Sequence, residues 1–319
     1  MVRPTRALVG IGALVMVLAG CGSGPTSNVA LVHTTQPPPS TTTTTVPPTT
    51  TTTLPPTTTT TTEQPGWTVV GSDALGVAVD ERTFTGPYGG VVTVVRFRAH
   101  RVTFALHVGS EDPPVGTATI TPDAGSVIGP QETPVLMGAF NGGFKMDAGA
   151  GGFEVNGQTL SPLVTGEASL VIDADGFARI GVWGQTVPVA GEQVVSVRQN
   201  LPPLVANGVA SPTVSDAAAW GEMLGPGPAV PRSGLGEDAE GNLLYAGGMS
   251  LDPSDLAAGL VDAGATTAME LDINPEWIQA DAAAAPGAPL TAMVPGQNRP
   301  ADQYEAGWSR DFVTVLALS

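Results

Sequence analysis

The stretch Phe140-Asn141-Gly142-Gly143-Phe144 decides the fold of this 319-residue chain, because it follows the clearest buried strand in the sequence. The apolar run from Pro134 to Ala139 has the length and character of a core strand. Asn and Gly tolerate backbone conformations that other residues avoid. The motif therefore predicts a tight turn that a ligand or another backbone segment can approach closely. A plain strand-ending turn between two core Phe residues is the alternative.

Residues 1–21 have the pattern of a lipoprotein signal peptide. Arg3 and Arg6 precede an uncharged apolar run from Ala7 to Ala19, which is too short to span a bilayer as a helix. The run ends in Leu18-Ala19-Gly20-Cys21, which resembles the lipobox of bacterial lipoproteins, and Cys21 is the only cysteine. An ordinary secretory signal is the alternative. We expect a lipid anchor at Cys21 and a location at the cell membrane, on its extracytoplasmic face.

Residues 22–65 are predicted to be a disordered linker. From Thr34 to Thr62 the chain consists of Thr runs broken by Pro pairs, a composition that cannot build a core. In polyproline conformation such a segment forms a semi-rigid stalk of up to roughly 90 Å. Residues 66–319 then form one domain of about 255 residues, within the usual range for a single domain. The domain has no cysteine and therefore no disulfide.

The charge balance excludes several function classes. Twelve Lys and Arg face 29 Asp and Glu, a net charge of −17, which argues against nucleic acid and anionic membrane surfaces as partners. The sequence has no Walker loop and no dinucleotide-binding glycine motif. Only His100 and His107 lie in the domain, which disfavours a histidine-rich zinc site. No metal and no cofactor is predicted.

The domain reads as α+β, a single globular domain of predominantly antiparallel or mixed β-sheet with few helices. Runs of β-branched and aromatic residues alternate with turn signals such as Asn156-Gly157, Asp175-Gly176 and Asn207-Gly208. Val91 to Arg98 and Arg101 to Val108 are expected to form a hairpin through Ala99-His100.

One helix is well signalled, between Asp252 and Gly264. Asp252 suits the N-cap, Pro253 the first helical position, and Gly264 the terminus. Leu256 and Leu260 lie on its apolar face. The helix runs between predicted strands at 243–246 and 267–273. This unit would be a right-handed crossover if the two strands are parallel neighbours.

A second polar cluster follows the strand that begins at Thr267. Alternation along a strand places Glu270, Asp272 and Asn274 on one face, with carboxylate-bearing residues about 6.6 Å apart. This spacing lies near the boundary between the retaining and inverting separations of glycosidases. An edge strand with a solvated polar face is the alternative.

Arg232 precedes the small residues Ser233-Gly234-Leu235-Gly236. In so acidic a chain, an arginine among small residues suits a bidentate clamp on phosphate or carboxylate. An ordinary surface salt bridge is the alternative.

The order of these pieces resembles the phosphodiester glycosidase family, over about Val91 to Leu318. The resemblance is carried by Asn141 to Phe144, by Arg232 to Gly236, and by Leu271-Asp272, with the helix between the last two. The chain departs from the family after Asp272. Family members commonly continue with a Gly-rich loop, whereas this chain has Ile273-Asn274-Pro275.

The resemblance implies an exported, lipid-anchored hydrolase that cleaves a sugar-1-phosphodiester in a cell-envelope or extracellular glycan. In that interpretation Arg232 holds the phosphate with help from the N–H groups of Gly142 and Gly143. Asp272 or Glu270 acts as base or nucleophile at the anomeric carbon. Asn141 binds sugar hydroxyls or orients the carboxylate, and Asn274 contributes to substrate binding.

Two further alternatives follow from the departure and from the acidic residues. A non-catalytic, carbohydrate-binding surface lipoprotein on the same scaffold is the second candidate function. Asp272, Glu270 and Asp147 offer oxygen ligands of the kind that Ca²⁺ takes, but no EF-hand spacing is present.

Overall fold

The computed structural model describes residues 66–111, 125–148, 151–221 and 227–318. The chain divides into two units, Met1–Thr58 and Thr59–Ser319, and every described residue belongs to the second. The predicted signal peptide with Cys21, and the Thr- and Pro-rich linker, lie outside the described residues. Within the described ranges, no helix has both the length and the apolar character needed to cross a membrane.

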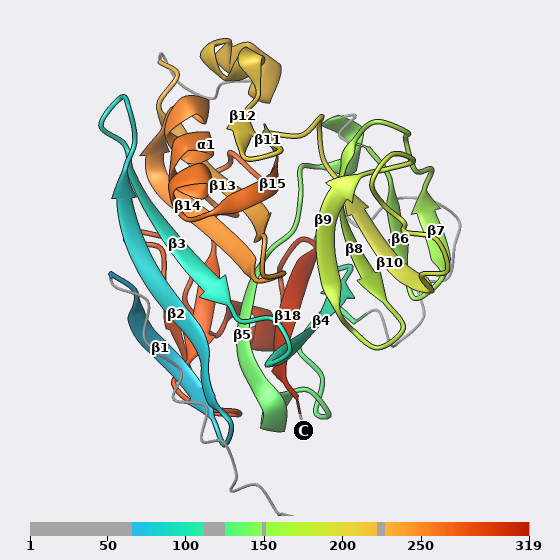
Figure 1. Ribbon diagram of the computed structural model, residues 1–319. Helices are drawn as coiled ribbons and strands as arrows, with labels where there is room; N and C mark the ends of the chain where they lie inside the picture. Colours follow the sequence, from blue (N-terminus) through green and yellow to red (C-terminus); the bar gives the residue numbers. More distant parts are fainter. Residues whose placement is uncertain (1–65, 112–124, 149–150, 222–226, 319) are drawn as a thin grey trace, which may run out of the picture. The chain divides into compact units, whose positions relative to one another are not determined.

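Three sheets account for the strands of the described ranges, and the paired strands within each sheet run antiparallel (Figure 1). The largest sheet has eight strands, in the order β1 (Thr68–Asp73), β2 (Gly76–Thr85), β3 (Val91–Phe97), β14 (Leu243–Leu251), β13 (Val230–Asp238), β15 (Ala265–Glu270), β11 (Val205–Ala206) and β12 (Val209–Ala210).

Each of the other two sheets has five strands. One has the order β7 (Gln158–Ser161), β6 (Phe153–Val155), β10 (Val194–Gln199), β8 (Ala168–Asp173) and β9 (Ala178–Val182). The other has the order β17 (Leu290–Ala292), β16 (Ala280–Ala283), β5 (Leu136–Asn141), β18 (Phe312–Ala317) and β4 (Val102–His107).

The main core lies where one face of the eight-stranded sheet meets the two five-stranded sheets. Phe97 on β3 and Tyr245 on β14 pack there with Phe140 on β5, and Leu170 on β8 belongs to the same buried cluster. Burial of apolar side chains is the dominant favourable term in folding. The strand before Asn141 is therefore held at the centre of the protein.

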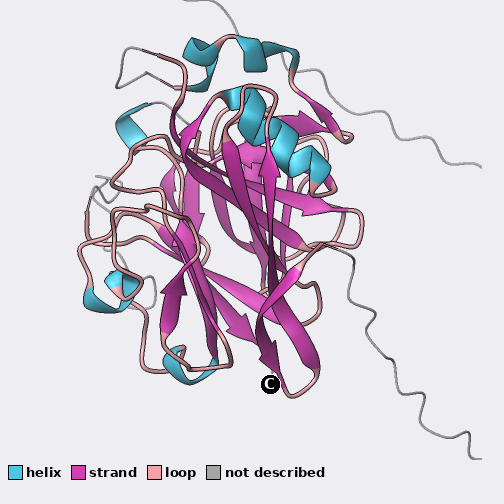
Figure 2. Cartoon of the chain, turned by 90° about the vertical axis from the view of Figure 1, so that its left-hand side faces the viewer, coloured by secondary structure: helices cyan, strands magenta, loops and turns pink. Residues whose placement is uncertain are grey.

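Helix α1 (Pro253–Asp262) covers the opposite face of the eight-stranded sheet, as Figures 1 and 2 show. Asp252 caps it in a capping box with Asp255, and Leu256 and Leu260 are fully buried against the sheet. The short elements of the described ranges are η2 (Thr133–Val135), η3 (Met146–Ala148), η4 (Pro212–Ser215), η5 (Ala217–Trp220) and α2 (Gln303–Ala306).

The fold class and most local predictions are confirmed. The domain is mostly antiparallel sheet with few helices. Asn156-Gly157 joins β6 to β7, Asn207-Gly208 joins β11 to β12, and all four residues have positive φ, as such two-residue turns require. The third predicted hairpin, β8 to β9, is also present.

One prediction about strand pairing is wrong, and the condition for the crossover at α1 is not met. The hairpin predicted through Ala99-His100 is wrong, because β3 pairs with β2 and β14 whereas β4 pairs with β18 in another sheet. The two strands around α1 are not neighbours, because β13 lies between β14 and β15 and is antiparallel to both. In each case a strand distant in sequence supplies the partner.

Candidate functional site

The motif that ends β5 forms a turn against β18. Every residue of β5 is buried, and Asn141 pairs with Phe312 at the start of β18. Phe140 is stacked on Phe97 at 5.6 Å, and Phe144 packs against Ile273. Both phenylalanine rings are therefore part of the core, and Asn141 is the one polar side chain of the motif.

Asn141 fixes the turn and the strand ends around it. Its Oδ1 accepts hydrogen bonds from the Tyr245 hydroxyl at 2.9 Å and from the Gln279 N–H at 3.2 Å. Its Nδ2 donates to the Gly142 carbonyl at 2.8 Å and to Ser233 Oγ at 3.0 Å. These four contacts use the full hydrogen-bonding capacity of the amide. The geometry thus suits a positioning residue rather than a direct ligand for sugar hydroxyls.

The two glycines are needed because other groups approach their α-carbons. A Cβ on Gly142 would lie 1.9 Å from Asp311 Oδ2, and one on Gly143 would lie 2.8 Å from Arg198 Cζ. Their N–H groups donate to the Asp311 carbonyl at 2.8 Å and to Asp311 Oδ2 at 3.0 Å. The N–H groups that the sequence predicts for phosphate binding are therefore engaged by a carboxyl-bearing residue of the protein itself.

Asp272 lies two residues beyond the end of β15 and is buried. Its Oδ1 accepts the N–H groups of Ile273 at 2.7 Å and Asn274 at 2.8 Å, and its Oδ2 accepts Arg310 Nη1 at 2.5 Å. Its own N–H donates to Ser233 Oγ, the atom that also contacts Asn141. Asp272 and the motif are thus joined through one serine.

The pKa of Asp272 is raised, chiefly by burial of its carboxyl group. The Arg310 guanidinium and the two N–H groups oppose this shift, and the nearby Asp311 charge adds to it. Burial thus favours the neutral form of Asp272, while Arg310 and the two N–H groups favour the carboxylate. Carboxyl groups with a shifted pKa beside a hollow are common at functional sites.

Arg310 and Asp311 are the residues that sequence reasoning missed. Arg310 binds Asp272 and donates to the Gly143 carbonyl at 2.8 Å, while Asp311 Oδ2 accepts Arg198 Nε at 2.7 Å. A signal was present, because both charged residues directly precede the apolar run of β18 and thus stand at a strand edge. Nothing local connects that edge to Asp272, which is 38 residues away.

Two hollows meet at the Asp272–Arg310 pair. The smaller has a volume of about 10 Å³, room for roughly one water molecule. It is lined by Asn141, Gly142, Gly143, Asp272, Trp277, Tyr304, Arg310 and Asp311. The larger has a volume of about 690 Å³, and its lining includes Asp272, Arg310, Asn274 and Lys145. Lys145 is exposed and is the only lysine in the chain.

The structure brings five of the predicted residues together and separates two from them. Asn141, Gly142, Gly143, Asp272 and Asn274 line these hollows. Arg232 and Glu270 line neither; both side chains are fully buried and paired with each other at 2.6 Å. Arg232 also donates to the carbonyls of Trp220, Leu251 and Pro228. The expected common face of Glu270 and Asp272 is replaced by two separate ion pairs, because β15 ends at Glu270.

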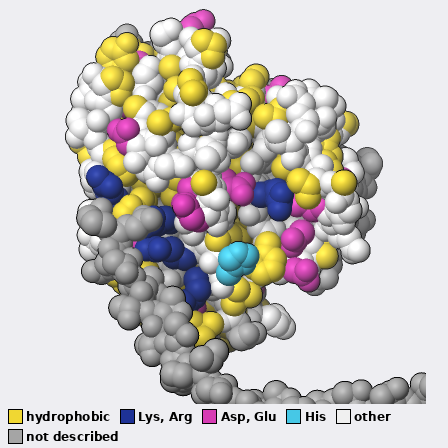
Figure 3. Space-filling view, viewed as in Figure 1, with side chains coloured by type: hydrophobic (Ala, Val, Ile, Leu, Met, Phe, Trp, Pro, Cys, Tyr) yellow, Lys and Arg dark blue, Asp and Glu magenta, His cyan; other side chains and the backbone are white. Residues whose placement is uncertain are grey.

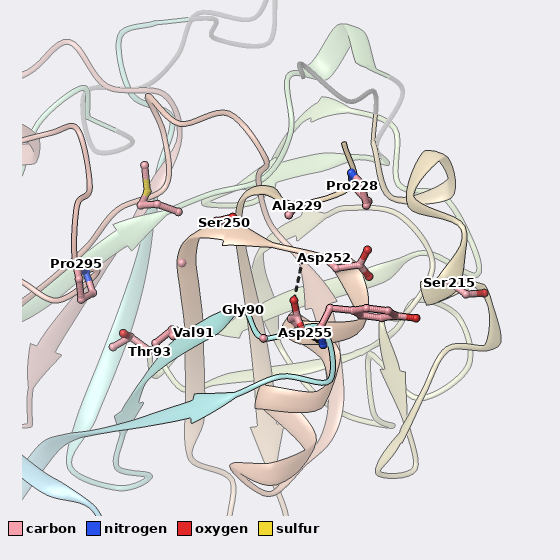
Figure 4. Close-up of a pocket in the computed structure, with 14 residues that line it drawn as sticks. Gly90, Val91, Thr93, Ser215, Pro228, Ala229, Ser250, Asp252, Asp255 and Pro295 are labelled. Carbon is pink, nitrogen blue, oxygen red and sulfur yellow. Dashed lines mark hydrogen bonds between the residues drawn. The ribbon is translucent and has the colours of Figure 1, made fainter. Parts of the chain in front are cut away.

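A third cavity, of about 650 Å³, lies away from these groups (Figure 4). The loop between β2 and β3 and the start of α1 form its walls. Its buried acid, Asp255, already accepts the N–H groups of Tyr88 at 2.7 Å and Asp252 at 3.2 Å, the second drawn as a dashed line. None of the predicted site residues lines this cavity. The groups suited to chemistry are therefore those around Asp272.

Within the described ranges, no three His, Cys, Asp or Glu side chains are grouped so that they could hold a metal ion. The acids considered for Ca²⁺ are dispersed, since Glu270 pairs with Arg232 and Asp272 with Arg310.

The surface in Figure 3 shows basic side chains only in small patches among uncharged and acidic ones. Arg96 and Arg98 pair with Asp80, and Arg101 with Asp73.

No family model and no curated protein matches the sequence. Among solved structures, the chain is similar to the catalytic domain of zebrafish N-acetylglucosamine-1-phosphodiester alpha-N-acetylglucosaminidase, which was solved auto-inhibited by its pro-peptide. The TM-score is 0.47 at 12% identity, covering 79% of this chain and 88% of that one.

Two bacterial structures are similar as well. A hypothetical protein from Synechocystis has a TM-score of 0.44 at 12% identity, with 77% of this chain and 63% of that one covered. A Burkholderia pseudomallei protein described as exported has a TM-score of 0.38 at 13% identity, with 78% and 76% covered. At these scores the likenesses say nothing of chemistry, which has to come from the residues of this chain.

Proposed function

We propose that this protein is an extracytoplasmic, lipid-anchored hydrolase that cleaves sugar-1-phosphodiesters, with Asp272 at the reacting carbon. The sequence resemblance to phosphodiester glycosidases names the reaction. The observation that carries the proposal is the Asp272–Arg310 pair, which stands at the junction of a one-water hollow and a large hollow that also contains Lys145.

The chemistry needs a carboxylate near the anomeric carbon and positive charge near the phosphate. Hydrolysis breaks the bond between C1 and the phosphate oxygen, and the phosphate monoester leaves with the electron pair. Asp272 either attacks C1 directly or takes the proton of the attacking water. Because a phosphate leaves more readily than an alcohol, charge stabilisation contributes more than protonation of the leaving oxygen.

The residues around Asp272 have separate roles in this reaction. Arg310 and Lys145 are the cations on the hollows that contain Asp272, and they hold the phosphate. Asn141 and Ser233 fix the strand ends, and Asn274 offers an amide to the sugar in the larger hollow. In this proposal the buried Arg232–Glu270 pair supports the end of β15 and does not touch substrate.

The alternative, a non-catalytic glycan-binding lipoprotein, is favoured by one observation. Ile273 stands where the family has part of a Gly-rich loop, and it packs with Phe144 and Val230 in an apolar cluster. That segment is held against the core, which leaves less freedom for backbone groups to follow a reacting phosphate.

The test is Asp272→Asn, assayed for sugar released from a chromogenic sugar-1-phosphodiester. We expect kcat/KM to fall about a thousandfold, within the range for loss of a base or nucleophile. Asp262→Asn is the matched control, because Asp262 is exposed at the end of α1, and it should retain wild-type turnover. Turnover undiminished in Asp272→Asn rules out the assignment. Wall-derived glycan that binds without release in the wild type supports the non-catalytic alternative.

A further inference from the structure

Trp308 is an exposed aromatic side chain held in an unfavourable backbone conformation. It is 55% exposed and has a φ of 59°, in the left-handed region that bulky residues avoid. Such a conformation is unfavourable for a bulky residue and persists only where the surroundings impose it. Here the Gln303 amide donates to the Gly307 carbonyl and, at 3.2 Å, to the Trp308 carbonyl. The turn is thus fixed, and the ring has a defined position.

One face of Trp308 is covered by a cation and a second tryptophan. The Arg299 guanidinium carbon lies 3.9 Å from the centroid of the Trp308 ring and 4.7 Å from that of Trp277. The two rings are 6.2 Å apart and tilted by 58°. Glu276 anchors Arg299 through its carbonyl at 3.0 Å and its carboxylate at 3.2 Å. The exposed area of Trp308 therefore belongs to its other face and its edges.

This Trp277–Arg299–Trp308 stack adjoins the candidate site. Trp277 lines the small hollow together with Asp272, and the Arg310 guanidinium carbon lies 5.8 Å from its ring. Trp308 is two residues before Arg310 in the chain. A substrate chain that extends from the small hollow past Trp277 would therefore come to the stack.

Polar groups surround the stack. The Glu276 side chain is 52% exposed, and its Oε1 accepts Asn298 Nδ2 at 3.2 Å. A pyranose ring has an apolar face of C–H groups and a rim of hydroxyl groups. An aromatic ring packs well on the apolar face of the sugar, and amide and carboxylate groups hydrogen-bond its hydroxyl groups.

We propose that the Trp277–Arg299–Trp308 stack is a glycan subsite, in which the exposed face of Trp308 stacks on a neutral pyranose ring of an oligosaccharide. The inference deepens the proposed function and rests on it for the role of the site: the substrate is a sugar chain, and Trp308 binds a ring beyond the one that reacts. Arg299 acts as a positioning residue, since it contacts both indoles and has its charge matched by Glu276.

The experiment measures binding and needs no turnover. The probes are malto-, cello- and chitohexaose, titrated calorimetrically into the full chain and into its Trp308→Gly and Trp308→Phe variants. Glycine removes the ring and relieves the positive φ, so the fold should be retained or gain stability. We expect Trp308→Gly to weaken binding of the preferred hexasaccharide at least tenfold and Trp308→Phe to weaken it less than threefold.

The control is Tyr88→Ala, because Tyr88 is 70% exposed but lines the separate cavity of about 650 Å³. Its affinity should equal that of the wild type. A loss confined to Tyr88→Ala would place the glycan in that cavity and overturn the proposal, as would equal affinity in Trp308→Gly or no binding of any hexasaccharide by the wild type. Binding that depends on Trp308 in a protein without hydrolase activity would uphold the subsite while the proposed function fails.

Discussion

Two buried carboxylate–arginine pairs, whose carboxylates stand two residues apart in the sequence, have opposite characters. In the first, Glu270 and Arg232 are each 0% exposed, and the guanidinium also binds three backbone carbonyls. In the second, Asp272 and Arg310 retain slight exposure, 4% and 6%, and line two hollows. Both pairs join a carboxylate to a guanidinium, but only the second can be reached from a hollow.

The difference shows that accessibility from a hollow, more than charge, distinguishes an ion pair that can take part in a reaction from one that only supports the fold. Arg232 has its Nε and both terminal nitrogens bound to nearby groups, and Glu270 Oε2 has no hydrogen-bond partner among the described residues. A substrate phosphate therefore cannot reach this pair without unfolding the end of β15. Asp272 needs no such rearrangement, because its carboxylate already borders space for a water molecule.

The largest effect is expected from Arg232→Met, which breaks the Glu270–Arg232 pair, here called the inner pair. The variant leaves the buried Glu270 carboxyl group without its partner, and the free energy of unfolding should fall by about 3–5 kcal/mol. The double variant Arg232→Met/Glu270→Leu should recover most of that loss, because no buried charge remains. Urea denaturation measures both.

The comparison fails if Arg232→Met unfolds at the wild-type urea concentration while its turnover disappears. That result would return Arg232 to the catalytic role that the sequence predicts for it.

The sequence predicts what local chemistry decides. The Asn141-Gly142-Gly143 turn, the capped helix α1 and the Asn-Gly hairpins all follow from residues close to one another in the chain. Pairing across distance is different. The sequence predicts β4 beside β3, yet β4 pairs with β18, more than 200 residues away. No local signal encodes such a choice, since it depends on which edges remain free after the sheets assemble.

The candidate site also combines features that are local in the sequence with contacts between distant segments. Asp272 is identified from its strand-end position, but its partner Arg310 comes from the start of β18, which only the assembled sheets bring near. The alternation rule places Glu270 and Asp272 on one face, and it fails because β15 ends between them. A rule for strands does not extend past the last strand residue.

The pH dependence of stability should also distinguish the pairs. Burial raises the pKa of Glu270 to about 8, against the opposing effect of Arg232. Between about pH 4.5 and 8 the folded state therefore binds more protons than the unfolded state, so stability falls as pH rises through this window. Glu270→Gln should flatten the fall, by an amount on the order of a few kcal/mol between pH 5 and pH 8.

Asp281 contributes a residual slope of the same sign, because burial raises its pKa to about 7. Glu240→Gln is the control, since Glu240 is exposed and should leave the curve unchanged. Denaturation curves at four pH values measure the slope. A slope that survives in Glu270→Gln at full size would show that the inner pair stays charged throughout.

The smallest effect concerns Lys145, which has no counterpart beside the inner pair. It lines the larger hollow with Asp272 and Arg310, and as an exposed cation it attracts a phosphodiester. Lys145→Ala should lower kcat/KM about tenfold, mainly through a higher KM, and Lys145→Arg should restore most of it. Because exposed charges are screened, the effect should shrink as salt rises from 0.05 to 0.5 M. Arg179→Ala removes a partly exposed cation, one paired with Glu192, and should change neither parameter. Equal losses of kcat/KM in Lys145→Ala and Arg179→Ala would mean that the charge of the whole surface, rather than a cation beside the Asp272 site, sets the affinity for substrate.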